Sequence, residues 1–510
     1  MRPITIPLLA LLLAALLLLS LAGCGDQPGP ATDDTTEPEP ALTESGDAVP
    51  ANRIVTLPYS AVDALNPFQT KSTMNRDICT LLYDSLVRLD ETFMPVPSVA
   101  ADCVLNGLTL TVSLRDDVRF TTGELLHPRD VVYSFQFAKE SPCYEARLAN
   151  FFSCTIEGDD VVFTLIEPNA QAVSCLDFPI VQFGTGESDI PIGCGRYRLY
   201  HKDADLYLEA YEQSSTMEEM EQQTLKLLDI STRENELQLL QIGEMSAFYV
   251  DPTTRKREKI FANEWDVPLL NLVYLGLNSS RDHLNDAAFR RALAAAIDKP
   301  TLCSSVYDAH ALAADAPFQP LWGEAPQEDV TYDPLAAPSY FDALGYTLSS
   351  SAKRTKNGQG ITLEMVCNSE NTVRLNAAKM IAQQLRDCGF GVNLSVLDYD
   401  SYLVRLDSGL WDLYIGEVKL TADMDLSLFF SADGKANYGL DSQSTSAQAY
   451  REWRSGTVDT STFEQVFLQD QPFLPLCFRS GILYCAKELQ IEGEINENDL
   501  YANLYGWSYQ

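Results

Sequence analysis

Positively charged residues are scarce in this sequence. Lys and Arg number 36 against 72 Asp and Glu, which gives a formal net charge of −36. Nucleic acids attract basic surfaces, so this balance argues against a nucleic-acid partner. It favours solubility and, more weakly, cationic or zwitterionic ligands, although a solvated acidic surface explains it as well.

Signatures of the common enzyme classes and of metal sites are also missing. The chain has no G-x-S-x-G, H-E-x-x-H, P-loop or dinucleotide-binding glycine motif. Its 12 cysteines form no C-x-x-C pair, and its 4 histidines stand far apart without ligand spacing. We therefore expect no catalytic residues, no metal site and no cofactor, although the many carboxylates leave a glycosidase-like pair open. The histidines are His127, His201, His283 and His310.

Only one stretch is long and apolar enough to enter a membrane. Residues 4–21 form a leucine-rich run after the cationic Arg2, and small residues precede Cys24. This pattern predicts a secretory signal peptide over residues 1–23, and an uncleaved transmembrane helix is the alternative. The tetrad "LAGC" resembles a bacterial lipobox, which implies cleavage before Cys24 and lipidation of its thiol, and so a membrane anchor.

Large apolar residues are almost absent from the segment that follows. Residues 24–52 are rich in Pro, Thr, Asp and Glu. Such a composition cannot bury enough surface to offset its ordering entropy, so the sequence predicts a disordered acidic tether. The protein is then expected on the extracytoplasmic face of the bacterial cell membrane, held by its lipid.

The cysteines leave the disulfide pattern open. Lipidation of Cys24 would leave 11 of the 12, an odd number. Cys477 and Cys485 flank "FRSGILY", where Gly481 could turn a hairpin and set the two thiols opposite each other. A disulfide and buried free thiols are both compatible with this pattern.

Segments in the first half predict a mixed α+β region. The apolar spacing in 74–90 predicts a helix, and the alternation in 107–120 predicts a half-buried strand. Pro128 and Asp130 are expected to open a helix after a turn at Gly123. The segments "DDVVFTLIEP" and "GRYRLY" add two more strands.

The second half predicts a parallel α/β arrangement. A strand at "NLVYLGLN" precedes a helix with Asn285 or Asp286 as its N-cap. Strands at "ITLEMVC", "GVNLSVLDY" and "WDLYIGEV" alternate with helices, which indicates right-handed crossovers. Near the end, "QPFLPLCFRSGILYCA" is expected to form a buried pair of strands. The fold class is therefore α/β with α+β portions.

The order of these segments resembles family 5 of the extracellular solute-binding proteins of peptide and nickel ABC transporters. The resemblance runs from about residue 53 to 487 and rests on "ALNPF", "LLYDSLVRLDETFMPVPSVAAD", "LRDDVRFTTGELLHPRDVVYSF", "PIGCGRYRL" and "AQQLRDCGFGVNLSVLDYDSYLVRLDSGLWDLYIGEV". It implies the two-lobed Venus-flytrap fold of the large peptide-binding class. Lobe one would hold residues 53–270 with a return segment 471–510, and lobe two would hold 271–470.

The resemblance also implies a function. A monomeric lipoprotein of this kind captures a peptide or similar small solute between its closing lobes and delivers it to ABC permease subunits. Nickel or haem is the alternative cargo, and a sensory receptor of the same fold is the alternative role. A secreted hydrolase acting through carboxylates is a third hypothesis, from another class.

Candidate ligand-binding residues follow from the same resemblance. In peptide binders of the family an aspartate holds the α-amino group of the ligand, and "GEVKLTADMDLSLFF" offers Asp423 or Asp425. Either acid could instead cap a helix. Leu426 stands where the family usually has proline, and "PIGCGRYRL" departs from the usual pattern at Cys194 and Arg196.

Aromatic and amide side chains near the expected cleft are further candidates, with core packing as the alternative for each. Trp322 is the strongest of them, because a loop bounded by proline and glycine holds it. The others are Asn66, Phe68, Tyr274, Asn278, Trp411 and Tyr414.

Overall fold

The computed structural model describes residues 54–214, 223–233, 235–254, 260–326 and 332–509. Its chain divides into two compact units, 1–48 and 49–510, and the described residues all belong to the second. The predicted signal peptide, Cys24 and the tether lie outside the described residues. In the part described, no helix is long and apolar enough to cross a membrane.

One mixed sheet contains the first strand of the body. Its order is β1 (Thr56–Tyr59), β10 (Thr224–Asp229), β9 (Asp205–Ala210) and β8 (Tyr197–Lys202), with β1 and β10 parallel. Helix α1 (Thr73–Leu82) packs against β1 and β8. The helix ends at Leu82, so the predicted helix over 74–90 is too long. Val87–Leu89 forms strand β2 instead.

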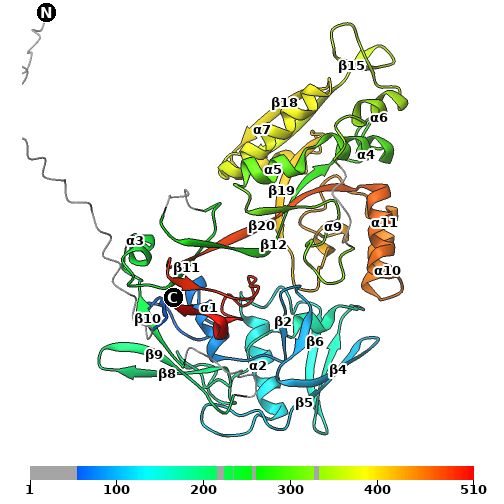
Figure 1. The fold of residues 1–510 in the computed structure, drawn as a ribbon. Helices are drawn as coiled ribbons and strands as arrows, with labels where there is room; N and C mark the ends of the chain where they lie inside the picture. Colours follow the sequence, from blue (N-terminus) through cyan, green and yellow to red (C-terminus); the bar gives the residue numbers. More distant parts are fainter. Residues whose placement is uncertain (1–53, 215–222, 234, 255–259, 327–331, 510) are drawn as a thin grey trace, which may run out of the picture. The chain divides into compact units, whose positions relative to one another are not determined.

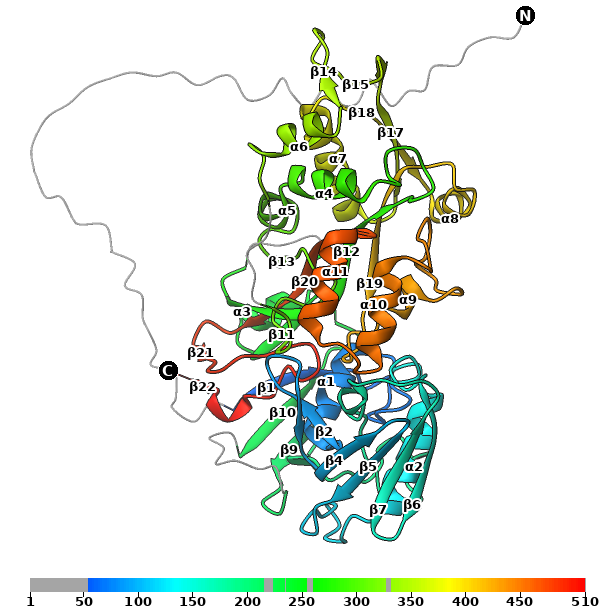
Figure 2. The same ribbon diagram turned by 90° about the vertical axis from the view of Figure 1, so that its right-hand side faces the viewer.

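An antiparallel sheet lies next in the chain, in the order β4 (Ala100–Asn106), β5 (Thr109–Leu114), β7 (Asp160–Leu165) and β6 (Phe151–Glu157). Helix α2 (Pro128–Glu140) packs against β6 and β7 (Figure 2). The helix begins as the sequence predicts, because Asp130 accepts hydrogen bonds from the backbone N–H groups of His127 and Phe183, both at 2.8 Å. Gly123 makes the preceding turn with a φ of +87°.

The largest sheet has the order β11 (Ala247–Val250), β20 (Phe473–Cys485), β12 (Asn263–Leu277), β19 (Leu413–Lys419), β17 (Thr362–Asn368) and β18 (Gly391–Leu397), with β13 (Ala311–Ala313) also paired to β20. Strand β17 pairs in parallel with both β18 and β19, which confirms the parallel arrangement that the sequence predicts. Helices α7 (Thr372–Asp387) and α8 (Tyr399–Asp407) make the connections.

The two connecting helices cover opposite faces of this sheet. Met365 of β17 shares a core with Ile381 of α7, whereas its neighbour Val366 shares a different core with Leu406 of α8. This alternation follows from the period of two along a strand. Helices α4 (Ala287–Ala296) and α5 (Lys299–Val306) join the α7 core, and Asp286 caps α4 by accepting from the backbone N–H of Ala288 at 2.9 Å.

Two long strands link the cores of the body. Strands β12 and β20 run side by side and antiparallel (Figure 1). Val267 of β12 belongs to the core that holds α1 and α2, and Val273 belongs to the core that holds α7. The predicted lobe limit at 270/271 falls inside β12, and the limit at 470/471 falls just before β20. The division into lobes stays a prediction.

Strand β20 corrects the prediction of a strand pair at its position. Residues 473–485 form one continuous buried strand. Gly481 makes no turn; a Cβ there would lie 2.3 Å from the Tyr249 ring, so glycine allows strand β11 to approach closely. Cys477 and Cys485 therefore lie far apart along one strand, and the cysteines of the described residues are free.

The remaining elements of the described residues follow in chain order. They are β2 (Val87–Leu89), β3 (Pro95–Pro97), η1 (Ala172–Cys175), α3 (Glu236–Gln241), α6 (Ala337–Ala343), β14 (Thr347–Leu348), β15 (Arg354–Lys356), β16 (Gln359–Gly360), α9 (Ser427–Phe430), α10 (Thr445–Arg454), α11 (Thr460–Asp470), β21 (Leu489–Gln490), η2 (Leu504–Gly506) and β22 (Ser508–Tyr509).

Candidate functional site

A cavity of about 1170 Å³ lies where α1, the β11 end, the middle of β12 and the C-terminal segment meet. We call it the charged cavity, because both acidic and basic side chains line it. Its walls also include the turn after β2, the loop 142–147 and the residues that follow β19. The charged lining residues are Arg76, Asp77, Asp84, Arg88, Asp90, Glu91, Arg147, Asp177, Arg196, Asp251, Lys419, Arg479, Glu494, Glu497 and Asp499.

Helix α1 supplies one wall because it is amphipathic. Ile78, Leu81 and Leu82 are buried in the core, which leaves Asp77 and Thr80 to line the cavity. The helix end is held by the backbone N–H of Gly195, which donates to the Leu82 carbonyl at 3.0 Å. A Cβ at Gly195 would lie 2.5 Å from the Leu82 carbonyl carbon, so this contact requires glycine.

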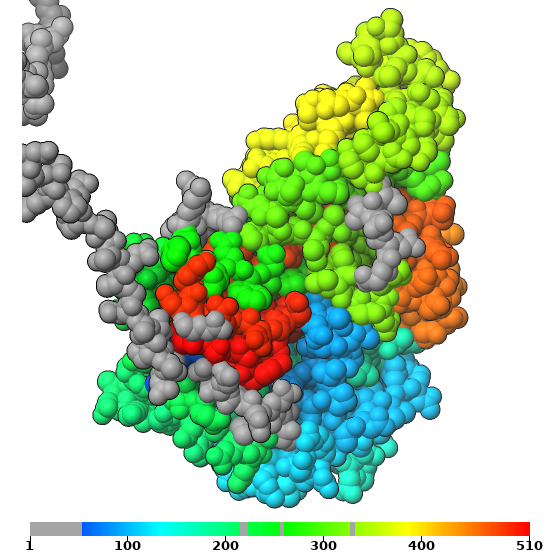
Figure 3. Space-filling view, viewed as in Figure 1, coloured from blue at the N-terminus to red at the C-terminus, as the bar shows by residue number. Residues whose placement is uncertain are grey.

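The C-terminal segment forms the opposite wall. On the face shown in Figure 3 these residues, in red, lie directly beside the blue N-terminal part of the body. Asp499 accepts hydrogen bonds from the Thr80 hydroxyl at 3.0 Å and from the Arg196 guanidinium at 2.8 Å. Arg196 also donates to the carbonyls of Tyr501 and Ala502. The segment is thus tied to α1 and to the residue that precedes β8.

Lys419 and Arg479 form further ion pairs around the cavity. Lys419, at the end of β19, pairs with Glu497 at 2.5 Å, and Glu497 also accepts from the backbone N–H of Leu270 at 2.7 Å. Arg479 of β20 pairs with Asp251 at 2.8 Å and with Glu417 at 2.7 Å. Burial alone would raise the pKa of Asp251, but the Arg479 guanidinium and the Thr253 hydrogen bonds lower it below its usual value.

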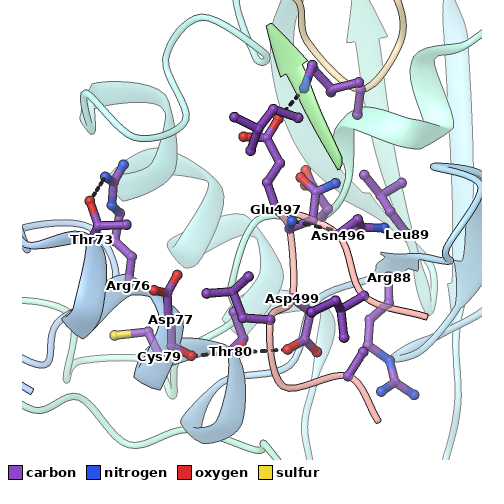
Figure 4. Close-up of a pocket in the computed structure, with 18 of the residues that line it drawn as sticks. Thr73, Arg76, Asp77, Cys79, Thr80, Arg88, Leu89, Asn496, Glu497 and Asp499 are labelled. Carbon is purple, nitrogen blue, oxygen red and sulfur yellow. Dashed lines mark hydrogen bonds between the residues drawn. The ribbon is translucent and has the colours of Figure 1, made fainter. Parts of the chain in front are cut away.

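Asp77 and Arg88 differ from these paired groups. Figure 4 shows both at the cavity wall, and no hydrogen bond reaches the Asp77 carboxylate or the Arg88 guanidinium among the residues drawn. The Thr80 hydroxyl donates to the backbone carbonyl of Asp77 and not to its carboxylate. Burial raises the pKa of Asp77 well above its usual value, Arg76 and Lys419 oppose this, and Asp499 adds to it.

The predicted ligand residue Asp423 is buried and fully engaged with the protein. One carboxylate oxygen accepts from Thr421 at 2.5 Å, and the other accepts from Asn169 at 2.9 Å and Arg454 at 2.7 Å. Burial alone would raise the pKa of Asp423, but Arg454 and these hydrogen bonds lower it. Thr421, two residues earlier, does line the charged cavity.

The second predicted acid, Asp425, binds the start of helix α9. It accepts from the backbone N–H of Ser427 at 2.9 Å and from the Ser427 hydroxyl at 2.8 Å. The Tyr450 hydroxyl donates to it as well. The N-cap of α9 is Leu426, without a side-chain cap, so Asp425 forms a turn just before the helix and is not its N-cap.

The predicted loop residues Asn66 and Phe68 hold the "ALNPF" loop against the body. The Asn66 amide donates to the carbonyls of Gly186 and Ser188 at 2.8 and 2.7 Å, and its oxygen accepts from the Phe68 backbone at 3.0 Å. The Phe68 ring is buried and stacks on Phe137 with 5.7 Å between ring centroids.

The remaining predicted residues lie in the core between β19 and helices α8, α10 and α11. Trp322 is fully buried against Phe318, with 5.2 Å between ring centroids. Trp411 donates to the Leu406 carbonyl at 3.0 Å and packs edge-on against Tyr414. The Tyr414 and Tyr274 hydroxyls are hydrogen-bonded at 3.1 Å, and the Asn278 amide donates to the Trp411 carbonyl at 3.0 Å.

The structure therefore brings Trp411, Tyr414, Tyr274 and Asn278 together, but none of the predicted binding residues is among those that line the charged cavity. Their role in binding stays a prediction. No motif in the sequence marks Asp77, Arg88 or the acids of the C-terminal segment, so none of these residues was predicted. Arg196 alone carried a signal, as a departure from the family pattern.

A metal centre finds no support in the described part of the chain. Within those residues, no group of three or more His, Cys, Asp or Glu side chains is arranged to hold a metal ion.

Comparison with known proteins places the chain among solute-binding proteins. The sequence profile of "Bacterial extracellular solute-binding proteins, family 5 Middle" matches residues 95–438. The chain is 22% identical to the oligopeptide-binding protein AppA of Bacillus subtilis, over 87% of this chain and 89% of AppA. It is 24% identical to the dipeptide-binding protein of Escherichia coli, over 71% of this chain and 75% of that protein.

Solved structures show the same fold. The nickel ABC transporter structure from Bacillus halodurans superposes with a TM-score of 0.71 at 19% identity, covering 87% of this chain and 97% of that one. The predicted mixed α/β periplasmic-binding-protein fold is thereby confirmed. Proteins of this family bind solutes outside the cytoplasm for ABC transporters and are not enzymes. With most of its length matched, the chain belongs to family 5 of the bacterial extracellular solute-binding proteins.

Proposed function

We propose that this protein is a lipid-anchored lipoprotein that captures a peptide-like solute in the charged cavity and delivers it to the permease of an ABC importer. The observation that carries the proposal is the cavity itself, with a volume of about 1170 Å³ and side chains of both charge signs. Pockets for small molecules usually measure about 300–1,000 Å³, so this cavity has room for a short peptide. A bare metal ion would leave most of it unfilled.

The charges of the cavity also favour a peptide-like solute. A peptide carries an ammonium and a carboxylate group, and the cavity offers carboxylates and guanidinium groups to both. Two relatives are named for such a cargo, AppA for oligopeptides and the Escherichia coli protein for dipeptides, whereas the Bacillus halodurans structure is named for nickel. Binding would favour closure of the two predicted lobes only as far as the solute contacts the closed form better than the open one.

The cargo can be tested on the full-length lipoprotein purified in detergent. Native mass spectrometry with random-sequence libraries of di- to pentapeptides should show retained peptides, and an excess of Ni(II)-histidine should not displace them. Retention of Ni(II)-histidine with no peptide retained would reject a peptide cargo. Uptake of a retained peptide by cells with and without the gene then separates transport from sensing, since a sensory receptor would leave uptake unchanged.

The anchor is tested separately. A Cys24→Ser variant removes the proposed lipidation site, so the protein should move from the membrane fraction to the medium or the periplasm. If the variant stays with the membrane as the wild type does, lipid anchoring at Cys24 is wrong.

A further inference from the structure

Eight of the fifteen charged residues that line the cavity are paired with one another. Arg196 pairs with Asp499, Lys419 pairs with Glu497, and Arg479 pairs with Asp251. Arg147 pairs with Asp177 in the same way. Asp84 and Asp90 accept hydrogen bonds from nearby hydroxyl or backbone N–H groups. These groups have little capacity left to bind a charged solute.

Asp77 is the exception among the acids that are not fully exposed. Its side chain is partly buried on helix α1, and its carboxylate has no hydrogen bond or ion pair within the described residues. Glu91 and Glu494 also lack such partners in the described part of the chain, but both are exposed to solvent. A carboxylate shielded from water without a partner is costly, and a bound cation would remove that cost.

Arg88 is the corresponding exception among the basic residues. It lies on β2, partly buried, and its guanidinium has neither a hydrogen bond nor an ion pair with any residue the structure describes. Its Nε atom is enclosed by protein and has no acceptor. A guanidinium group binds a carboxylate through two parallel hydrogen bonds, so Arg88 is suited to the anionic end of a solute.

We propose that Asp77 binds the cationic group of the solute and Arg88 its anionic group, so that the charged cavity selects zwitterionic solutes. This inference rests on the proposed function. Asp423 is not available for the same task, because Thr421, Asn169 and Arg454 already engage both of its oxygens. The selection would therefore be made at α1 and β2 and not at the acid that the family resemblance indicates.

The test uses three forms of one random peptide library, with both ends free, with the amino end acetylated and with the carboxyl end amidated. Each form is titrated against the full-length lipoprotein and against Asp77→Asn, Arg88→Gln, Glu140→Gln and Lys71→Gln. The last two remove a charge from an exposed side chain that does not line the cavity, and they serve as controls. Thermal unfolding of each variant confirms that it is folded.

Acetylation should weaken binding to the wild type about tenfold to a hundredfold, and Asp77→Asn should lose the same factor for the free library. Acetylation should then have little further effect on Asp77→Asn, and amidation little further effect on Arg88→Gln. The control variants should bind as the wild type does.

The possible failures are distinguishable. If the wild type binds none of the three libraries, the proposed function is wrong and this inference falls with it. If the wild type binds all three forms equally, the peptide-binding function stands and the inference is wrong. A loss in Asp77→Asn that acetylated peptides share with free peptides would also overturn the assignment, because Asp77 would then act on the fold and not on the cation.

Discussion

Asp423 accepts a hydrogen bond from Asn169, which lies 254 positions earlier in the chain, at 2.9 Å. The contact joins the loop after β7 to the loop after β19. The backbone supports it, because the N–H of Ala170 donates to the carbonyl of Arg454 at 2.8 Å. Gln171 adds a hydrogen bond to Glu324 at 2.9 Å. Asp423 therefore connects two distant parts of the body, whatever its role toward a solute.

Arg454→Gln should destabilise the protein strongly. The side chains of Arg454 and Asp423 are only 13% and 5% exposed, so the variant would leave a buried carboxylate without its counter-charge. Breaking such a pair costs about 3–5 kcal/mol of the free energy of unfolding. Urea denaturation measures the loss, and Arg451→Gln on the exposed side of α10 should change the free energy of unfolding by no more than about 0.5 kcal/mol. Equal, small effects in both variants would show that the pair does not contribute to stability.

Acid should weaken this pair over a defined pH range. The pKa of Asp423 is lower in the folded protein than in the unfolded chain, where it is about 3.9. Its contribution to stability is therefore complete above about pH 5 and is lost as pH falls through the folded pKa. Urea unfolding from pH 7 down to pH 3 should show this loss, and Asp423→Asn should show a smaller one. If the wild type and Asp423→Asn lost stability in acid to the same extent, Asp423 would not be the group responsible for the loss.

Local patterns predicted much of the fold. Helix α2, helix α7 and strand β5 follow from spacing and capping residues that act over a few positions. The prediction of two strands in place of β20 was wrong for a physical reason. All of its 13 residues are buried, so no periodicity marks it, and Gly481 resembles a turn residue although it gives space to Tyr249.

The candidate site was less accessible to sequence analysis. Asp423 has partners because Asn169 and Arg454 reach it from other parts of the chain. Asp77 faces the C-terminal segment, which is also distant in sequence, and is left without a partner among the described residues. Neither acid stands in a motif that reports those contacts. Trp322 likewise stands in a loop bounded by proline and glycine, yet its ring enters the core.

Asp77→Asn should stabilise the solute-free protein at neutral pH. Folding raises the pKa of Asp77, so the native state binds this proton more tightly and stability falls as pH rises from about 4 through the folded pKa. The amide does not ionise, so the gain in the free energy of unfolding should be about 1.4 kcal/mol for each unit by which folding raises the pKa of Asp77. Unfolding in urea at pH 7 and at pH 3 tests this, because the gain should vanish at the lower pH. A variant less stable than the wild type at pH 7 would show that Asp77 has a partner.

Cys477 and Cys485 should not form a disulfide with each other. Eight residues of strand separate their Cα atoms by roughly 26 Å, whereas a disulfide requires less than about 7 Å. Peptide mapping without reductant should find no cross-linked pair, and the melting temperature should not change when reductant is added. Finding the Cys477–Cys485 cross-link in the folded protein would contradict a continuous β20.

Substitution of Trp322 should affect stability and leave solute affinity nearly unchanged. Its ring is fully buried between Phe318 and Trp453, and its indole N–H has no acceptor among the described residues. Trp322→Ala should lower the free energy of unfolding by about 3–5 kcal/mol through the cavity it leaves. Trp322→Phe loses no hydrogen bond and should cost less.

The neighbouring Leu321 is 42% exposed, so Leu321→Ala serves as the matched control. Denaturation and peptide titration of the same variants separate the two roles. If Trp322→Phe were as stable as the wild type but bound peptide at least about tenfold more weakly, Trp322 would be a solute-binding residue after all.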